Sequence, residues 1–327
     1  MSAVGAAPVT LDDVLRASAS SAGRLHRTPL LRSQTLGRAF GGRAWLKAEL
    51  FQKTGSFKPR GILAKIATLS PEERARGVIT ISAGNAAAAV AYGAAVEGID
   101  ALVVMAQGAS AAKVEATRGY GATVDLESPN FVAAFERLQL LLEETGRTLV
   151  HPFDDPDVIA GHGSLGLEVL EDRPDVDVVV VPVGGGGLVS GVTAALKGAR
   201  PDVRVVGVEP EGSAALGLAL AAGEPVRIVP ESIADGLNAP YAGETCLAVC
   251  RERLDGCVTV TEDEIRAGFR FLYRRAKLAA EPAGAAGAAA LLAGKIPDAA
   301  GRTVVAVVSG GNVAAETTSG ILTADEG

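Results

Sequence analysis

The sequence predicts an α/β protein whose sheets are mainly parallel. Short apolar strands alternate with helix-forming runs along most of the chain, and few polar residues interrupt the strands. Strands that are apolar on both faces and separated by helices are typical of parallel sheets covered on both sides. Strands are expected at 44–46, 78–81, 101–105, 122–126, 148–150, 178–181, 203–208, 257–260 and 303–308.

Helices are expected between these strands. The first, Leu11–Ser20, follows Thr10, whose hydroxyl can cap its N-terminus. Others are expected at 62–69, 86–97, 110–118, 130–145, 158–170, 214–221, 262–277 and 282–292, with one more that ends at 198. The four strands between 78 and 150 are enough for one compact lobe.

The composition excludes several classes of function. The 327 residues carry a net charge of −7 and no basic stripe, which argues against nucleic acid or an anionic membrane as a partner. We expect no signal peptide and no membrane span, since no apolar run reaches about 18 residues without charge. Three cysteines, Cys246, Cys250 and Cys257, match no zinc spacing, and their odd number suits a cytoplasmic setting.

Lys58 lies in the most informative stretch, TGSFKPRG at 54–61. Pro59 fits the first turn of a helix, and Thr54 and Ser56 can cap its start. The positive end of the helix dipole disfavours the ammonium form, which predicts a neutral, nucleophilic amine. Taken alone, a solvated surface lysine is the commoner situation, so the interpretation depends on the other motifs.

Four successive glycines, Gly184, Gly185, Gly186 and Gly187, follow an apolar strand and open a helix. Their backbone N–H groups can converge on an anion at the helix N-terminus. The loop lacks the Lys-Ser/Thr of a Walker A motif and the spacing of a dinucleotide fingerprint, so it suits a single phosphate monoester. The alternative is a glycine turn that allows close helix packing.

Two further loops follow predicted strands. Ser82-Ala83-Gly84-Asn85 can hold a carboxylate or a phenolic oxygen, or can be a simple capping turn. Ser309, after the last strand, can donate a hydrogen bond to a neutral ring nitrogen. A reactive lysine, a phosphate cradle, a carboxylate loop and this hydroxyl together describe a site for pyridoxal 5'-phosphate at the carboxyl ends of the strands.

From Arg27 to Asn312, the chain resembles the serine/threonine dehydratase family of fold type II pyridoxal phosphate enzymes. The resemblance rests on the motifs QKTGSFKPRG (52–61), KVEATR (113–118), HPFDDPDVIAG (151–161), VPVGGGGL (181–188), IADG (233–236) and EPAG (281–284). It implies two open parallel-sheet domains with the active site in the cleft between them. The large domain would comprise 1–75 and 152–327, and the small, mobile domain 76–151. A homodimer is also expected from the resemblance.

The resemblance also implies roles for matching residues. Lys58 would bind the cofactor covalently and move the Cα proton of a small hydroxy amino acid, which β-elimination converts to a 2-oxo acid and ammonia. The other cofactor contacts would come from Phe57, Asn85, Gly184, Gly185, Gly186, Gly187, Gly236, Glu281 and Ser309. The substrate would be held by Ser82, Ala83, Gly84, Asn85 and Ala86.

Several positions depart from the family pattern. Ala86 and Ala88 stand where His and Gln are usual, which predicts a larger, more apolar pocket and a bulkier substrate such as phenylserine. Ala83 replaces the serine that racemases use, so little racemisation is expected. His162 stands where Gln is common, without an evident reason. Glu209 matches one ligand of a divalent metal site, but the acidic residue expected after it is missing.

Two other functions stay open at this point. One is β-replacement, as in related synthases. The other is a catalytically silent protein that binds the cofactor or an amino acid, which the alanine-rich loop suggests. The intact Lys58, glycine loop and Ser309 argue against the second.

Overall fold

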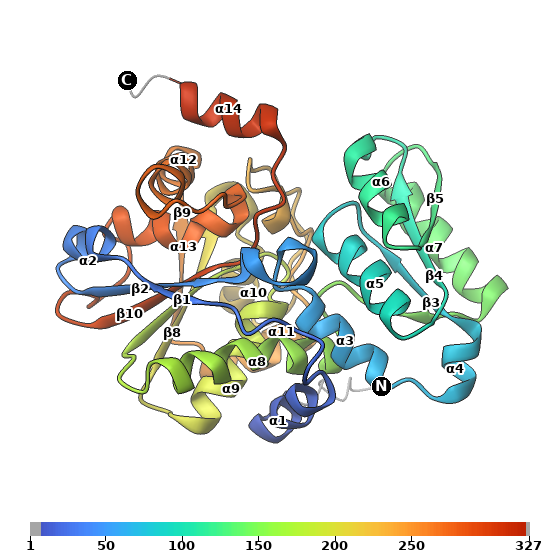
Figure 1. The fold of residues 1–327 in the computed structure, drawn as a ribbon, viewed down its shortest axis with the longest axis horizontal. Coiled ribbons are helices and arrows are strands. Elements are labelled where there is room, and N and C mark those ends of the chain that lie inside the picture. Colours follow the sequence, from blue (N-terminus) through green and yellow to red (C-terminus); the bar gives the residue numbers. More distant parts are fainter. Residues whose placement is uncertain (1–7, 325–327) are drawn as a thin grey trace.

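The computed structural model describes residues 8–324 and contains two sheets side by side (Figure 1). The larger sheet has the strand order β1-β2-β10-β7-β8-β9. Its strands are β1 (Leu30–Arg32), β2 (Arg43–Ala48), β7 (Val178–Pro182), β8 (Arg204–Pro210), β9 (Gly256–Val260) and β10 (Thr303–Val308). All neighbours are parallel except β1, which pairs antiparallel with β2.

The smaller sheet is parallel throughout and has the order β5-β4-β3-β6. Its strands are β3 (Val78–Ile81), β4 (Ala101–Ala106), β5 (Thr123–Ser128) and β6 (Thr148–Leu149). The hydrophobic core of this sheet also contains Ile62 and Ile66, which precede its strands in the sequence, and Val158, which follows them. The division of the chain at 76 and 151 therefore stays a prediction.

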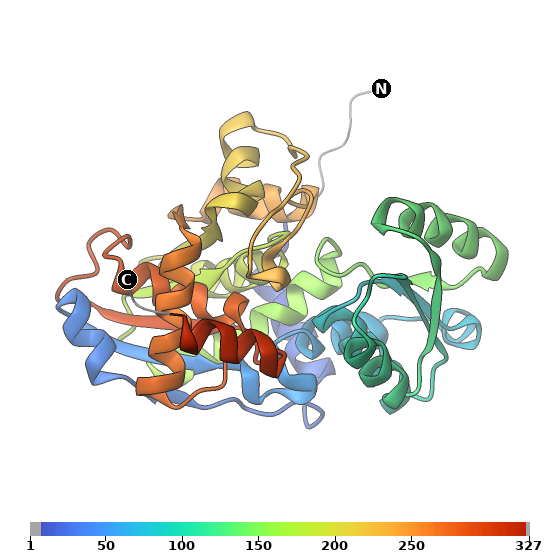
Figure 2. The same cartoon turned by 90° about the horizontal axis from the view of Figure 1, so that it is seen from above.

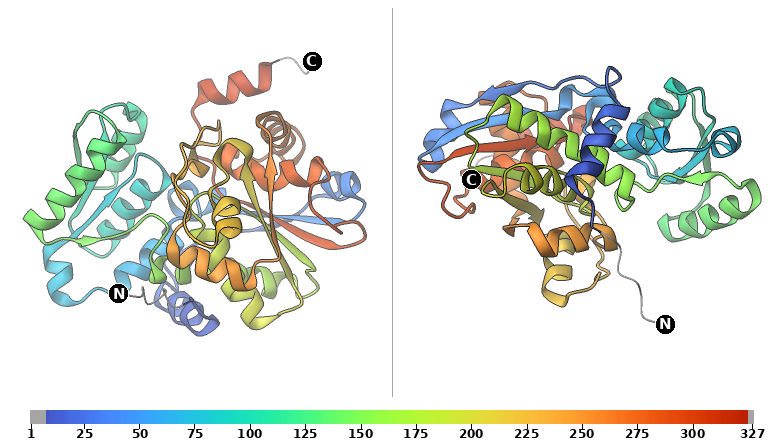
Figure 3. Two further views of the ribbon diagram at one scale, coloured as in Figure 1. Left: turned by 180° about the vertical axis from the view of Figure 1, so that it is seen from behind. Right: turned by 90° about the horizontal axis from the view of Figure 1, so that it is seen from below.

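Helices cover both faces of both sheets. Their bounds are α1 Leu11–Ser20, α2 Gln34–Phe40, α3 Pro59–Ala67, α4 Pro71–Arg76, α5 Asn85–Val96, α6 Ala111–Gly119, α7 Phe131–Thr145, α8 Pro156–Asp172, α9 Gly187–Ala199, α10 Ala215–Ala222, α11 Glu244–Arg253, α12 Glu262–Phe271, α13 Pro282–Leu292 and α14 Ala315–Thr323. The helix α3 lies between the two sheets and packs against α8, which runs along one face of the larger sheet (Figures 1 and 3). Seen from above, α10 and the loop after it stand out from the body of the molecule (Figure 2).

Alternate residues of the central strands build two separate cores. Val178, Val180 and Ala306 pack under α2, α12 and α13, whereas Val179 and Val305 pack under α8, α9, α10 and α11. This division follows from the period of two along a strand, and it explains why the strands are apolar on both faces.

The predicted alternation is confirmed, and the predicted bounds of α1, α13, β3 and β10 agree with the structure. The short elements β1, α2 and α4, together with α11 and α14, were not predicted. The caps predicted for the lysine helix are wrong. Two short 3₁₀ turns follow β2, so Thr54 and Ser56 lie outside the cap position, and their buried hydroxyls have no hydrogen-bond partner among the described residues.

A buried ion network fastens α3, the helix that begins next to Lys58, to the rest of the protein. The guanidinium of Arg60, 1% exposed, binds Glu49 through Nε (2.7 Å) and Nη2 (2.9 Å). It also binds Glu168 of α8 through Nη1 (2.7 Å) and Nη2 (2.9 Å). Lys47 on β2 donates to Glu168 at 2.5 Å, so two cations face two carboxylates.

We expect Glu49→Gln to lower the free energy of unfolding by about 3 kcal/mol, because a cation whose partner is removed stays buried without full compensation. Urea unfolding measures this loss. Glu115→Gln, which breaks an exposed pair with Arg118, is the control and should cost less than about 0.5 kcal/mol. Equal losses for the two variants would contradict a role for the network in stability.

Candidate active site

Lys58 lies immediately before α3, where Pro59 occupies the first helical position. Its Nζ donates a hydrogen bond of 2.5 Å to the carbonyl oxygen of Pro152 and lies 5.2 Å from the ring centre of Phe57. Although part of the residue keeps some exposure, its amine is enclosed by protein atoms. This burial lowers the pKa of Lys58 to about 8, against the smaller opposing effect of the Glu281 carboxylate.

The N-terminus of α5 lies at the carboxyl end of β3. Its cap position is Gly84, which offers no side-chain hydrogen bond, and a Cβ at this glycine would meet nothing within 4 Å. The hydroxyl of Ser82 accepts a hydrogen bond from the N–H of Gly84 at 3.1 Å. The first N–H groups of α5, at Asn85, Ala86 and Ala87, have no partner within the helix and can bind an anion.

The glycine loop forms a second uncapped helix start, at the carboxyl end of β7. Gly186 has φ +97° at the cap position of α9, a conformation that side chains rarely adopt. A Cβ on Gly185 would lie 2.4 Å from the ring of Phe153, and one on Gly184 would lie 3.1 Å from Leu237. The neighbouring segments therefore leave room for backbone only, as an anion cradle requires.

Asn85 and Glu281 connect the smaller sheet's helices to the larger sheet. The amide of Asn85 donates to Glu281 Oε1 at 2.8 Å and accepts from Asn312 Nδ2 at 2.8 Å. A Cβ on Gly236 would lie 3.5 Å from the same Glu281 oxygen. Burial, together with the negative charge of Asp235, raises the pKa of Glu281 to about 7.

Ser309 is held beside the lysine through the backbone. Its carbonyl oxygen accepts a hydrogen bond of 3.0 Å from the N–H of Phe57. The next residue, Gly310, accepts from the N–H of Glu281 at 3.0 Å. A Cβ on Gly310 would lie 2.5 Å from Glu281 Oε1, so the loop after β10 fits tightly between the lysine segment and Glu281.

The structure thus brings together Lys58 and the predicted cofactor residues through one chain of contacts. It also adds residues to which sequence analysis gave no role: Pro152, Phe153 and Asn312. Their motifs, HPFDDPDVIAG and SGGN, were visible in the sequence, but the contacts join segments up to 258 residues apart.

Residues 23–310 match the model of the pyridoxal-phosphate dependent enzyme family, and the chain belongs to that family. It is 45% identical over 306 residues to the L-threonine ammonia-lyase of Thermotoga maritima, covering 93% of this chain and 76% of that protein. Identity to the catabolic L-threonine dehydratase TdcB of Escherichia coli strain K12 is 41% over 308 residues, or 94% of each chain. The structure of maize serine racemase has a TM-score of 0.91 at 36% identity, with 95% of this chain and 96% of that chain covered. These similarities confirm the predicted resemblance and fold class.

Pyridoxal 5'-phosphate is therefore the cofactor, and the residues present fit it. Lys58 offers an enclosed amine whose pKa is lowered to about 8, as attachment to a carbonyl carbon requires. The uncapped start of α9 would hold the phosphate, and Asn85 keeps a second amide hydrogen for a polar ring substituent.

A divalent metal at Glu209 does not fit the residues present. Its Oε1 accepts from the N–H of Leu216 (2.7 Å), and its Oε2 accepts from Gly217 (2.9 Å) and the Cys257 thiol (3.3 Å). Within residues 8–324, no three His, Cys, Asp or Glu side chains are grouped to hold a metal ion. The carboxylate instead holds the N-terminus of α10.

Among residues 8–324, no helix is long and apolar enough to span a bilayer.

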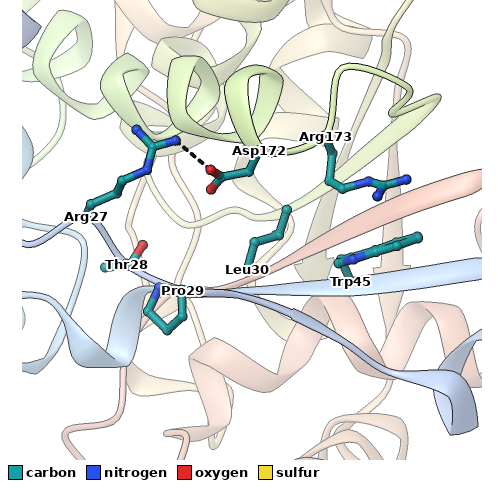
Figure 4. Close-up of a pocket in the computed structure, with 7 residues that line it drawn as sticks. All are labelled: Arg27, Thr28, Pro29, Leu30, Trp45, Asp172 and Arg173. Atoms are coloured by element: carbon teal, nitrogen blue, oxygen red, sulfur yellow. Dashed lines mark hydrogen bonds and ion pairs between the residues drawn. The ribbon is translucent and has the colours of Figure 1, made fainter.

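A cavity of about 450 Å³ lies between β1 and the end of α8 (Figure 4). Its charged groups are paired within the protein: Arg27 binds Glu171 (2.6 Å) and Asp172 (2.5 Å). The guanidinium of Arg173 lies 4.0 Å from the ring centre of Trp45. None of the predicted site residues lines this cavity.

We expect the nucleophilicity of Lys58 to rise with pH through about 8 rather than near the ordinary value of 10.5, because burial favours the neutral amine. The measurement is the rate at which an amine-directed reagent labels Lys58 in the cofactor-free chain, followed by peptide mass spectrometry across the pH range. A free lysine amide is the reference. A midpoint near that of the reference would mean that the amine is solvated.

Proposed function

We propose that this protein is an ammonia-lyase that eliminates the β-hydroxyl of a 3-hydroxy amino acid, with Lys58 as the catalytic residue. The observation that carries the proposal is the enclosed amine of Lys58, with a pKa of about 8, at the strand ends where α5 and α9 begin without side-chain caps. The threonine ammonia-lyase and dehydratase at 45% and 41% identity support the reaction class.

The chain's own residues divide the work of the reaction. The N–H groups at the start of α5, with Ser82 and Asn85, bind the substrate carboxylate and orient its Cα–H bond toward Lys58. As a neutral amine, Lys58 removes that proton. Pyridoxal 5'-phosphate, when bound, supplies the sink for the electron pair left at Cα. The β C–O bond then breaks with loss of water, and hydrolysis yields the 2-oxo acid and ammonia.

The substrate proposed is bulkier and more apolar than threonine. Ala86 is buried and Ala88 half-buried on the first turn of α5, where the family pattern has His and Gln. Two methyl groups replace two large polar side chains, so this part of the pocket offers space and no hydrogen-bond donor. A 3-hydroxy amino acid with an aromatic or branched side chain, such as phenylserine, suits such a surface.

Three further properties belong to the same proposal. The protein is a cytoplasmic homodimer, and residues 76–151 form a domain that moves against the rest. The ion pair of Lys113 with Asp235 (2.6 Å) and the Asn85–Glu281 hydrogen bond are suited to hold the closed position. With Ala83 in place of a serine, the opposite face of the substrate has no acid, and little racemisation accompanies elimination.

Release of 2-oxo acid and ammonia by the holoenzyme tests the reaction. The panel is L- and D-serine, L-threonine, L-threo-3-phenylserine, 3-hydroxyleucine and threo-3-hydroxyaspartate, and we expect the highest kcat/KM for a bulky apolar substrate. Lys58→Ala should lose at least about 10³-fold in kcat, since it removes both base and attachment point. Silence of the wild type on every substrate, or normal turnover by Lys58→Ala, would refute the proposal.

The double variant Ala86→His, Ala88→Gln tests the substrate pocket. We expect it to raise kcat/KM for threonine relative to phenylserine by about 10-fold, the usual scale for a change in pocket size and polarity. Ala95→Ser, on the solvent side of the same helix, is the matched control and should leave the ratio unchanged. An unaltered ratio in the double variant would mean that other residues set specificity.

A further inference from the structure

His162 is buried in the middle of α8 and takes no part in the chemistry described above. Its side chain is 0% exposed, and among residues 8–324 neither ring nitrogen makes a hydrogen bond of good geometry, although the backbone of Gly187 and Lys58 offers weak ones. A neutral imidazole always carries one N–H, and leaving this group buried and unpaired costs free energy. A well-formed core hydrogen bond therefore does not account for a histidine at this position, and the packing of its ring becomes the feature to explain.

The imidazole lies against the segment that carries the lysine. Its ring centre is 4.8 Å from the ring centre of Phe57, in an edge-to-face arrangement with an interplanar angle of 65°. Phe57 precedes Lys58 directly, and the amine of Lys58 lies 5.2 Å from the centre of the same ring. The Phe57 ring is thus in contact with the imidazole and close to the amine.

Gly61 allows this close approach of α3 and α8. A Cβ on Gly61 would lie 2.6 Å from His162 Nε2 and 2.5 Å from the carbonyl oxygen of Val158. Any side chain at position 61 would push the lysine helix away from α8. The imidazole fills the space that the glycine leaves. The shape of the imidazole therefore limits where the Phe57 ring can pack.

The imidazole stays neutral in this environment. Burial, more than any other cause, holds the pKa of His162 well below its usual range, and the cations Lys58 and Arg60 act in the same direction, against weaker hydrogen bonds to the backbone of Gly187 and Lys58. A neutral ring adds no second positive charge beside the lysine. Its role is therefore one of packing and orientation.

We propose that His162 is a positioning residue: it holds the ring of Phe57, and through that ring it keeps the Lys58 amine in the orientation that binds pyridoxal 5'-phosphate. This inference rests on the proposed role of Lys58. It assigns a role to the one residue of α8 whose departure from the family pattern the sequence left unexplained.

A double-mutant cycle on the full-length chain tests the route through Phe57. The dissociation constant of pyridoxal 5'-phosphate is measured by absorbance and fluorescence titration for wild type, His162→Leu, Phe57→Leu and the double variant. We expect His162→Leu to weaken binding about 3- to 10-fold, the range of an aromatic pair. The double variant should bind no more weakly than Phe57→Leu, because residues that act through one contact are not additive.

Leu138→Ala is the control, since it truncates a fully buried helical side chain in the core of the smaller sheet, to which neither Phe57 nor His162 belongs. It should change the dissociation constant less than about 2-fold and add independently to Phe57→Leu. Additive effects of His162→Leu and Phe57→Leu, or a His162→Leu effect no larger than the control, would overturn the inference. If Lys58→Ala kept the absorbance band of covalently attached cofactor, the proposed function itself would be refuted. Failure of the inference on His162 and failure of the proposed function therefore give different results.

A pH readout separates His162 from an ordinary packing residue. A histidine that stays neutral when folded binds a proton only after unfolding. The free energy of unfolding therefore falls as the pH drops below about 6.5, the ordinary pKa of histidine. The loss of unfolding free energy between about pH 8 and about pH 5.5 should be smaller in His162→Leu than in wild type or Leu138→Ala. Equal losses in all three would contradict a buried neutral imidazole.

Discussion

The buried guanidinium of Arg60 is the contact on which the rest of the site depends. Its nitrogens meet Glu49, just after β2, and Glu168 on α8, so one side chain ties the start of α3 to the larger sheet and to α8. Lys58 lies only two residues earlier. Because both carboxylates are fully used by cations, the network can stay in the protein interior without a net charge. The amine of Lys58 is then free to be enclosed without a carboxylate partner of its own, and its pKa falls.

Parallel topology places the other components of the site. Strand β10 ends beside the lysine segment, where Ser309 accepts from the N–H of Phe57, and β3 and β7 likewise lead into loops that expose backbone rather than long side chains. At α5 and α9 the cap residues are Gly84 and Gly186, neither of which satisfies the first N–H groups of its helix. The free N–H groups and the helix dipoles then favour bound anions, which are the carboxylate and phosphate that this chemistry requires.

The departures from the family pattern lie around this unchanged centre. In the function proposed, Ala86 alters the surface that a substrate side chain would meet, whereas the backbone donors of α5 are unaffected by it. Glu209 has become an internal cap for α10, which gives its buried carboxylate three hydrogen-bond donors without a cation. His162, which stands where Gln is common in the family pattern, makes a ring contact with Phe57. In each case Lys58, the glycine loop and Ser309 are unchanged.

The sequence by itself determined the elements and the chemistry that depends on local pattern. Apolar runs separated by helices predicted nearly every long strand and helix, since burial on both faces leaves no polar periodicity, and the glycine loop and Lys58 could be recognised from adjacent residues. The short elements β1 and α2, and the antiparallel pairing of β1, carried no comparable pattern. Only the tertiary structure decided that Pro152 receives the lysine amine, that Asn85 meets Glu281, and that Gly61 lets His162 reach Phe57. These contacts join residues about 100 to 200 positions apart, and they depend on how helices pack, which local sequence does not encode.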